Sequence, residues 1–158
     1  MTLAITSPAF AADAAIPARY TGDGEDLSPP LAFAGLPVGT ASLALIIEDP
    51  DAPDPAAPQM TWVHWIVYNI PATARAFAEN AARRGLPPGA RTGRNDWGRT
   101  AYGGPCPPTG CHRYVHRLLA LDTVLPDLNG PTRAQLEAAL TGHVLEEARL
   151  IGRYARSA

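Results

Sequence analysis

The sequence predicts a mainly β protein, and three observations favour that class. Its 17 prolines and 14 glycines are spread along all 158 residues, which leaves little room for long helices. Three runs of apolar and β-forming residues fall at 43–48, 61–70 and 113–121, and each is typical of a buried strand. Helix signals are concentrated near the end of the chain. At this length, and with 46% hydrophobic residues, we expect a single domain spanning 1–158.

The first two predicted strands differ in their burial. Residues 43–48 form a short apolar run that stops at Asp49-Pro50, so Asp49 is expected at a strand end. Residues 61–70 carry apolar side chains on both alternating faces, which indicates a central strand covered on both sides. A period of two then places four side chains on one face: Trp62, His64, Ile66 and Tyr68.

The third predicted strand, 113–121, divides its side chains in the same way. One face carries His112, Tyr114, His116 and Leu118, and the other carries Arg113, Val115, Arg117 and Leu119. Because Arg113 faces away from His112 and Tyr114, we expect it to donate to a carboxylate or to loop carbonyl groups.

Helix signals follow the strands. Thr132 to Gln135 match a capping box, and apolar residues at helical spacing come after it. Gly142 interrupts this pattern, so we expect two short helical pieces around it and an extended segment at 150–154. Residues 72–84 have good helix propensity, but Phe77 is their one large apolar side chain. They predict a surface helical turn or a loop.

Charge and hydropathy exclude several classes of partner. The formal net charge of −2 comes from scattered residues with no basic run, which argues against nucleic acid. No apolar stretch approaches the roughly 18 residues of a membrane-spanning helix. The first 15 residues lack a basic n-region, so we interpret them as mature protein and expect a cytoplasmic location. In that compartment the two cysteines are expected to be reduced thiols.

The segment 104–116, GPCPPTGCHRYVH, contains both cysteines and two of the four histidines. A zinc site is disfavoured because Cys111 and His112 are adjacent and would point to opposite faces of an extended chain. A disulfide between Cys106 and Cys111 stays open as an alternative for an oxidising compartment, although Pro107 and Pro108 stiffen the loop between them. The sequence predicts no metal and no cofactor.

Other polar residues have a structural and a functional interpretation. Asp49 and Asp51 belong to a proline-rich turn, where a carboxylate often caps backbone amides. His64 lies in a buried strand, where a lone histidine is more often a hydrogen-bonded core residue than a ligand-binding one. Residues 94–98 are expected to be a structural turn. Neither a Gly-x-Ser-x-Gly elbow nor a phosphate-binding loop is present, so no catalytic residue is predicted.

Five motifs follow one another in an order that resembles one family. They are YTGDG with LSPPL at 20–31, DPDAP at 49–53, WVHW at 62–65, GRND at 93–96 and GPCPPTGCHRY at 104–114. This set resembles the phosphatidylethanolamine-binding protein family, in its bacterial branch often called Raf-kinase-inhibitor-like. The resemblance implies a β-sandwich with a large antiparallel sheet, a smaller sheet and short helices near the C-terminus.

The resemblance also implies an anion pocket at one end of the large sheet. Carried over by motif, its ligand-binding residues are Asp49, His64, His112, Tyr114, Gly104, Pro107 and Trp62. Residues His112 and Tyr114 share a strand face and could donate to one anion side by side. For Asp49, two roles remain open: it accepts a hydrogen bond from His64, or it receives the ammonium group of an ethanolamine head group.

The function that the resemblance implies is non-enzymatic binding of a phosphate, a phosphorylethanolamine or a phospholipid head group. The alternative is an inhibitor that contacts a kinase or a protease through its surface. A weaker alternative is a small hydrolase that uses Asp49 and His64 as acid and base, although no nucleophile accompanies them. The family also allows a homodimer.

Overall fold

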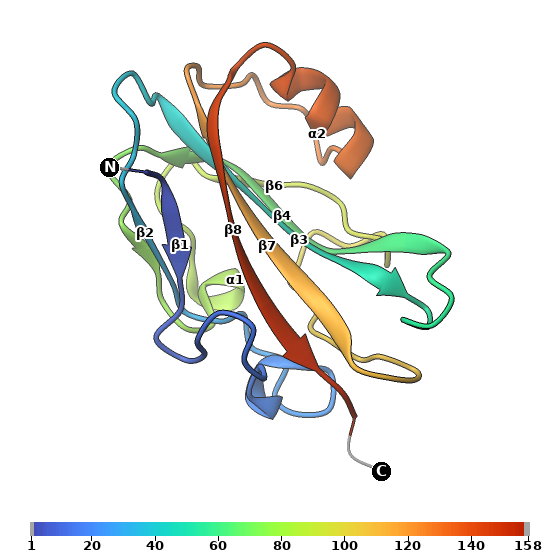
Figure 1. Ribbon diagram of the computed structural model, residues 1–158. Coiled ribbons are helices and arrows are strands. Elements are labelled where there is room, and N and C mark those ends of the chain that lie inside the picture. The colour runs from blue at the N-terminus through green and yellow to red at the C-terminus, as the bar shows by residue number, and fades with distance from the viewer. Residues whose placement is uncertain (1, 157–158) are drawn as a thin grey trace.

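The computed structural model describes residues 2–156 and folds them into two antiparallel sheets (Figure 1). The larger sheet has the strand order β6-β4-β3-β7-β8, and the smaller has the order β1-β2-β5. The strands are β1 (Ala4–Thr6), β2 (Leu31–Ala34), β3 (Ser42–Ala52), β4 (Met60–Pro71), β5 (Ala76–Phe77), β6 (Arg91–Thr92), β7 (His112–Leu121) and β8 (Val144–Tyr154). The helical pieces are a 3-10 turn (Ala18–Tyr20), α1 (Ala81–Arg84) and α2 (Arg133–Leu140). The predicted fold class is therefore confirmed.

The three predicted strands form the centre of the larger sheet. Strand β3 pairs with β4 on one side and with β7 on the other, and its residues 43–47 are almost completely buried. The prediction that Asp49 ends this strand is wrong. Asp49 pairs with Trp62 and Ala52 pairs with Met60, so β3 continues through Pro50 to Ala52 with an irregular register.

A β-bulge at His64 changes which side chains of β4 share a face. Ile47 pairs with Trp65 while Glu48 pairs with Val63, so His64 is an extra residue in β4. As a result Trp62 and His64 border a cavity on one side of the sheet, whereas Ile66 and Tyr68 belong to the core on the other side. The prediction that these four side chains share one face is wrong, because the bulge resets the alternation.

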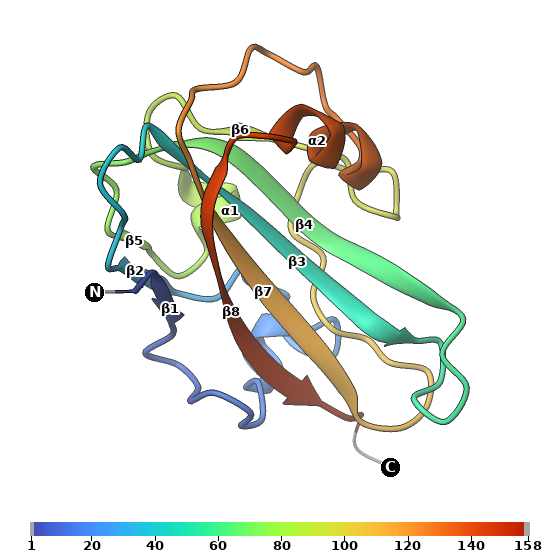
Figure 2. The same ribbon diagram turned by 45° about the horizontal axis from the view of Figure 1, so that its top comes forward.

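The smaller sheet and α2 lie on opposite faces of the larger sheet (Figures 1 and 2), and each face carries an apolar core. One fills the space between the two sheets and contains Phe33, Leu45 and Tyr114. The other lies beneath α2 and contains Leu119 and Leu136. Since Tyr114 and Leu119 come from opposite faces of β7, the two faces predicted for this strand are confirmed.

Helix α2 begins at the predicted capping box. The Thr132 side chain accepts from the amide of Gln135, and the Gln135 side chain accepts from the amide of Thr132. The expectation of a second helical piece after Gly142 is wrong. Strand β8 starts at Val144 instead, because pairing with the full length of β7 satisfies its backbone. The extended segment at 150–154 is confirmed as the end of β8.

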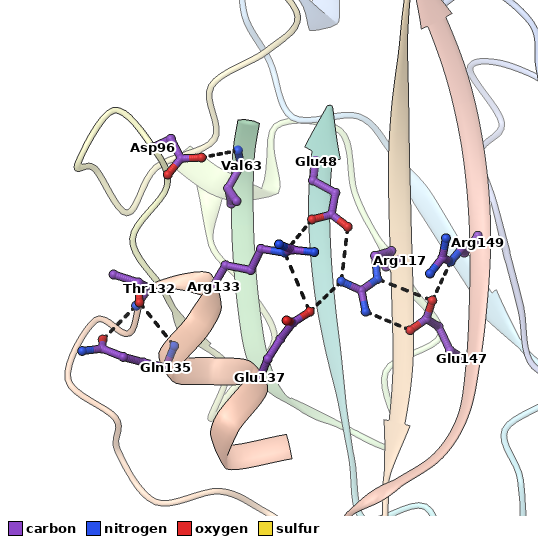
Figure 3. Close-up of polar contacts among 10 residues, drawn as sticks. All are labelled: Glu48, Val63, Asp96, Arg117, Thr132, Arg133, Gln135, Glu137, Glu147 and Arg149. Carbon is purple, nitrogen blue, oxygen red and sulfur yellow. Dashed lines mark hydrogen bonds and ion pairs between the residues drawn. The ribbon is translucent and has the colours of Figure 1, made fainter. Parts of the chain in front are cut away.

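Ion pairs attach α2 to the outer face of the larger sheet (Figure 3). The guanidinium of Arg117 on β7 contacts three carboxylates: Glu48 of β3 at 3.2 Å, Glu137 of α2 at 2.9 Å and Glu147 of β8 at 3.0 Å. Arg133 of α2 also reaches Glu48, at 2.7 Å. The Arg117 side chain is only 11% exposed, so the centre of this network is shielded from solvent, whereas Glu137 and Arg133 at its edge are 39% and 37% exposed.

Residues 72–84 form a surface segment as predicted, with the two-residue strand β5, the short helix α1 and a buried Phe77. At the opposite end of the larger sheet, the loop after β3 and the loop before β7 lie close together (Figure 2). A Cβ atom at Gly110 would lie 2.9 Å from Pro55, which confirms that these loops are in contact. Within residues 2–156, no helix has both the length and the apolar character needed to cross a bilayer.

Candidate functional site

A cavity of about 370 Å³ opens where these loops meet the ends of β3, β4 and β7. We call it the sheet-end cavity. Its volume is within the range of small-molecule sites. The polar side chains that line it are Asp49, His64, Cys106, His112 and Tyr114. Trp62 and Pro107 also line it, so the structure brings together six of the seven predicted ligand-binding residues, which are up to 65 positions apart in sequence.

Asp49 is paired with His112. Its Oδ2 lies 2.6 Å from Nδ1 of His112, while its Oδ1 accepts from the amide of Asp51 at 2.7 Å. On the far side of the ring, Nε2 of His112 donates to the carbonyl oxygen of Thr109 at 2.8 Å. Because that carbonyl can only accept, Nε2 carries a hydrogen and one proton is shared between Nδ1 and the carboxylate. The pair as a unit therefore has no net charge.

Burial raises the pKa of the Asp49 carboxyl, although the hydrogen bond from His112 acts in the opposite direction. Of the two roles open to Asp49, acceptance from His64 is not the one seen. His64 instead donates through Nδ1 to the carbonyl oxygen of Gly103, at 2.7 Å. The acid–base pair of the hydrolase alternative is therefore not in contact.

His64 presents a neutral imidazole to the sheet-end cavity. Its ring packs edge-on against Tyr114 and Trp97, with centroid distances of 5.2 and 5.1 Å. Burial lowers its pKa to about 4, and nearby His116 and His112 lower it further against the effect of the Gly103 carbonyl. Since Nδ1 holds the hydrogen that bonds Gly103, Nε2 has a free lone pair. This atom makes no hydrogen bond to the described part of the chain.

Tyr114 supplies the other unpaired polar atom. The residue is 1% exposed, and its Oη is buried without a hydrogen-bond partner among residues 2–156. Burial, with the charge of Asp49, raises the pKa of this phenol, so it stays protonated and able to donate. An unpaired buried hydroxyl costs about 1 to 3 kcal/mol unless a ligand or water satisfies it.

Aromatic and proline side chains form the wall and the mouth. Trp62 packs edge-on against Trp97 with ring centroids 5.5 Å apart, and Pro107 and Pro108 line the opposing loop. Met60 lies at the mouth and is 48% exposed. The sequence analysis missed Trp97 and Met60 as lining residues. One feature of the sequence is linked to Trp97. Gly103 packs so closely against the indole ring that an added Cβ atom would lie only 2.4 Å from it, so only glycine fits there.

Gly104 does not line the sheet-end cavity. Its amide donates to Oδ1 of Asp26 at 2.8 Å, and a Cβ here would lie 2.5 Å from that oxygen and from the carbonyl oxygen of Tyr20. This glycine is required for a close approach of two loops. It holds the backbone next to Gly103, and its own backbone raises the pKa of His64 against the effect of burial.

The turn at 94–98 supports the bulge at His64, as its predicted structural role requires, but it also contributes Trp97 to the cavity wall. The Asn95 side chain donates to the carbonyl oxygens of His64 and Ala101 and accepts from two amides of its own turn. Asp96 accepts from the amide of Val63 at 2.7 Å, as Figure 3 also shows. These bonds fix the backbone on both sides of the His64 ring.

Three further polar residues lie outside the site. Arg113 forms a two-bond ion pair with Asp51, which confirms its expected role as a donor to a carboxylate. His116 is a core residue that contacts the carbonyl oxygens of Tyr114 and Leu150 through Nδ1. Cys111 borders a second hollow on the other side of the 107–110 loop.

Both cysteines are exposed free thiols. Cys106 lines the sheet-end cavity, whereas Cys111 does not. Within the described residues, no three His, Cys, Asp or Glu side chains are arranged to hold a metal ion. The described chemistry of the cavity is therefore a hydroxyl donor, an imidazole lone pair and a neutral Asp49–His112 pair, inside an apolar collar.

Comparisons with known proteins agree with this architecture. The family model described as phosphatidylethanolamine-binding protein matches residues 6–155. A UPF0098 protein of Methanothermobacter thermautotrophicus is 50% identical over 142 residues, which cover 89% of this chain and 91% of that protein. A UPF0098 protein of Chlamydia pneumoniae is 45% identical over 153 residues, covering 97% and 99%.

Two crystal structures have the same fold over nearly the whole chain. A phosphatidylethanolamine-binding protein homologue from Chlamydia trachomatis is 40% identical with a TM-score of 0.90, and the match covers 99% of each chain. YbcL from Escherichia coli, described as a member of the mammalian PEBP family, is 32% identical with a TM-score of 0.88, covering 99% of this chain and 100% of that one. The chain therefore belongs to the phosphatidylethanolamine-binding protein family, in its UPF0098 and YbcL-like branch of bacteria and archaea.

Proposed function

We propose that this protein binds a small phosphorylated or carboxylated anion in the sheet-end cavity, without chemical conversion of the ligand. The observation that carries the proposal is the buried Oη of Tyr114, which has no partner in the described chain and belongs to the cavity wall beside His64. A hydroxyl in this position gains a hydrogen bond when an acceptor oxygen enters the cavity. A phosphate or carboxylate supplies such an oxygen.

The structure divides the predicted ligand-binding residues into two groups. Tyr114 and His64 keep a polar atom available for a ligand, whereas both nitrogens of His112 and both oxygens of Asp49 already have protein partners. We therefore assign Tyr114 and His64 to direct contact. Asp49 and His112 hold the wall in place, with Trp62 and Pro107 as apolar surface.

The apolar collar favours a ligand that carries carbon next to its anionic group. Trp62, Trp97, Met60 and Pro107 surround the mouth, where methylene groups of a head group would be buried. The name of the family points to phosphorylethanolamine, which has this composition. Two or three hydrogen bonds with a charged ligand contribute about 1.5 to 3 kcal/mol each, and association costs offset much of this gain, so the free head group should bind weakly.

Calorimetric titration with phosphorylethanolamine tests the proposal. The variants Asp49→Leu and His112→Ala should each weaken binding at least tenfold, because either change leaves the other partner unpaired and releases the wall of the cavity. The matched controls are Asp122→Leu and His143→Ala, which break an exposed His–Asp pair of 2.8 Å elsewhere. The controls should bind like the unaltered protein. Equal affinity in all four variants would overturn the site.

A further inference from the structure

The position of hydrogen on His64 conflicts with binding of a bare anion. A fully ionised anion such as sulfate offers only acceptor atoms, yet the imidazole presents an acceptor lone pair at Nε2. On the proposed function above, we infer that the sheet-end cavity takes up its anion together with one proton, and that this proton is bound by Nε2 of His64. Tyr114 then donates a second hydrogen bond to the same ligand.

Two contacts fix the hydrogen that His64 already has. Nδ1 lies 2.7 Å from the carbonyl oxygen of Gly103, and a carbonyl cannot donate, so the hydrogen is on Nδ1. A rotation of the ring by 180° would break this bond. Trp97 and Tyr114, which pack edge-on against the ring, also hold its orientation. Nε2 is consequently the only place where the ring can accept a proton.

His112 cannot supply the positive charge instead. Its Nε2 hydrogen is directed at Thr109, and its Nδ1 shares a proton with Asp49 at 2.6 Å. This pair is already neutral as a unit, so a further proton would have to break one of the two bonds. Among the two histidines of the cavity, His64 is thus the one with a free site for protonation.

Before a ligand arrives, the backbone groups of Gly103 and Gly104 favour the charged form of His64, but burial of the ring outweighs them. Strand β7 contributes His112, Tyr114 and His116, and β3 contributes Asp49, whose charge is offset by His112. From the loops come Cys106 and the Arg99 guanidinium, which lies over Trp97. No carboxylate of the described chain pairs with His64. Burial accordingly lowers its pKa to about 4 in the absence of a ligand.

An anion in the cavity would supply the missing counter-charge and raise that pKa. Affinity should then increase as the pH falls, by up to about tenfold per unit, in the window between the pKa of the complex and about pH 4. The sign follows from linkage, because the complex holds more protons than the free protein in that window. The cavity would act as a site that loads at lower pH.

Calorimetry with sulfate separates proton uptake from anion binding, since sulfate has no titrating group in the range used. The heat of binding, measured at about pH 6 in buffers with different ionisation enthalpies, should report uptake that approaches one proton per sulfate. The variant His64→Gln keeps a donor for Gly103 but cannot take up a proton, so its uptake should fall to zero. His143→Gln, which changes an exposed histidine, should behave like the unaltered protein.

The outcomes distinguish this inference from the proposed function. Sulfate binding without proton uptake in the unaltered protein would overturn the inference and leave the anion site standing. Full uptake in His64→Gln would also overturn it, because the proton would be bound elsewhere. If neither sulfate nor phosphorylethanolamine binds at any pH at which the protein is folded, the proposed function itself is wrong. If His64→Gln fails to fold, the number of protons taken up by the unaltered protein on sulfate binding still tests the inference.

Discussion

Two buried tyrosines near the sheet-end cavity, Tyr102 and Tyr114, differ in whether the hydroxyl group has a hydrogen-bond partner. Tyr102 donates its hydroxyl to the carbonyl oxygen of Tyr20 at 2.7 Å, whereas the hydroxyl of Tyr114 has no partner within residues 2–156. A hydroxyl that is paired in the native state contributes about 1 kcal/mol to stability, and an unpaired one subtracts from it. On the proposed function, the hydroxyl of Tyr102 is therefore structural, and the hydroxyl of Tyr114 is the one that binds the ligand.

Replacing each tyrosine by phenylalanine tests this contrast. Tyr114→Phe should leave the free energy of unfolding unchanged or slightly higher, and should weaken phosphorylethanolamine binding about tenfold. Tyr102→Phe should lower stability by about 1 to 2 kcal/mol, because it leaves a buried carbonyl unpaired, and should keep affinity. Urea unfolding and calorimetric titration measure the two effects. The roles given to these hydroxyls would be wrong if Tyr114→Phe lost stability and kept affinity while Tyr102→Phe lost affinity and kept stability.

His116 and His64 make stability depend on pH. Burial lowers the pKa of each to about 4, below the ordinary 6.5, so the unfolded chain binds more protons between these values. Stability should therefore be complete above about pH 6.5 and should fall on acidification, by up to about 1.4 kcal/mol per pH unit for each histidine. Comparing urea unfolding at about pH 7 and pH 5 checks this above the range of the carboxyl groups. His143→Gln should show the same slope, whereas constant stability would contradict the burial of neutral rings.

At the scale of elements, α2 depends on charge as well as on apolar contact. Leu136 and Leu140 pack on the sheet, but beside them Arg117 contacts three carboxylates at once. Glu48 is only 7% exposed, and its ionic partners in the described chain are all arginines. Breaking such a network leaves charges that solvent cannot easily reach.

Arg117→Met should therefore lower the free energy of unfolding by about 3 to 5 kcal/mol, because methionine keeps the apolar stem and removes the charge. The matched control is Arg149→Met, which breaks one pair with Glu147 from a position that is 59% exposed. Its expected cost is below about 1 kcal/mol. Urea unfolding compares the two. Equal costs would mean that the network does not anchor the helix.

Sequence patterns predicted these elements where local and tertiary preferences agree. The runs that became β3, β4 and β7, and the capping box of α2, each carry their own signal. The bulge at His64 and the start of β8 at Val144 do not, because pairing with a neighbouring strand determines both. For the same reason one of the two roles left open for Asp49, acceptance from His64, is not seen, since the bulge and the Gly103 carbonyl decide where His64 points.

At the scale of the whole molecule, the two faces of the larger sheet pack against other elements, and one end of the sheet forms the cavity. The outer face carries α2, and the inner face packs on the smaller sheet (Figure 1). The ion pairs lie on the outer face, and the end of the sheet opens into the sheet-end cavity. The formal net charge of −2 offers no long-range attraction for an anion. On the proposed function, affinity therefore comes from short-range contacts inside the cavity. Composition does not detect these contacts, whereas the family motifs point to the residues that line the cavity, except for Gly104.

The central claim is that an anion binds between Tyr114 and His64, and crystals grown with selenate test it most directly. The selenium atom gives an anomalous signal that locates the anion without assumptions about the rest of the density. The account predicts a peak in the sheet-end cavity, with selenate oxygens at hydrogen-bonding distance from Oη of Tyr114 and Nε2 of His64. Selenate peaks only at surface arginines such as Arg94, with none in the cavity, would contradict it.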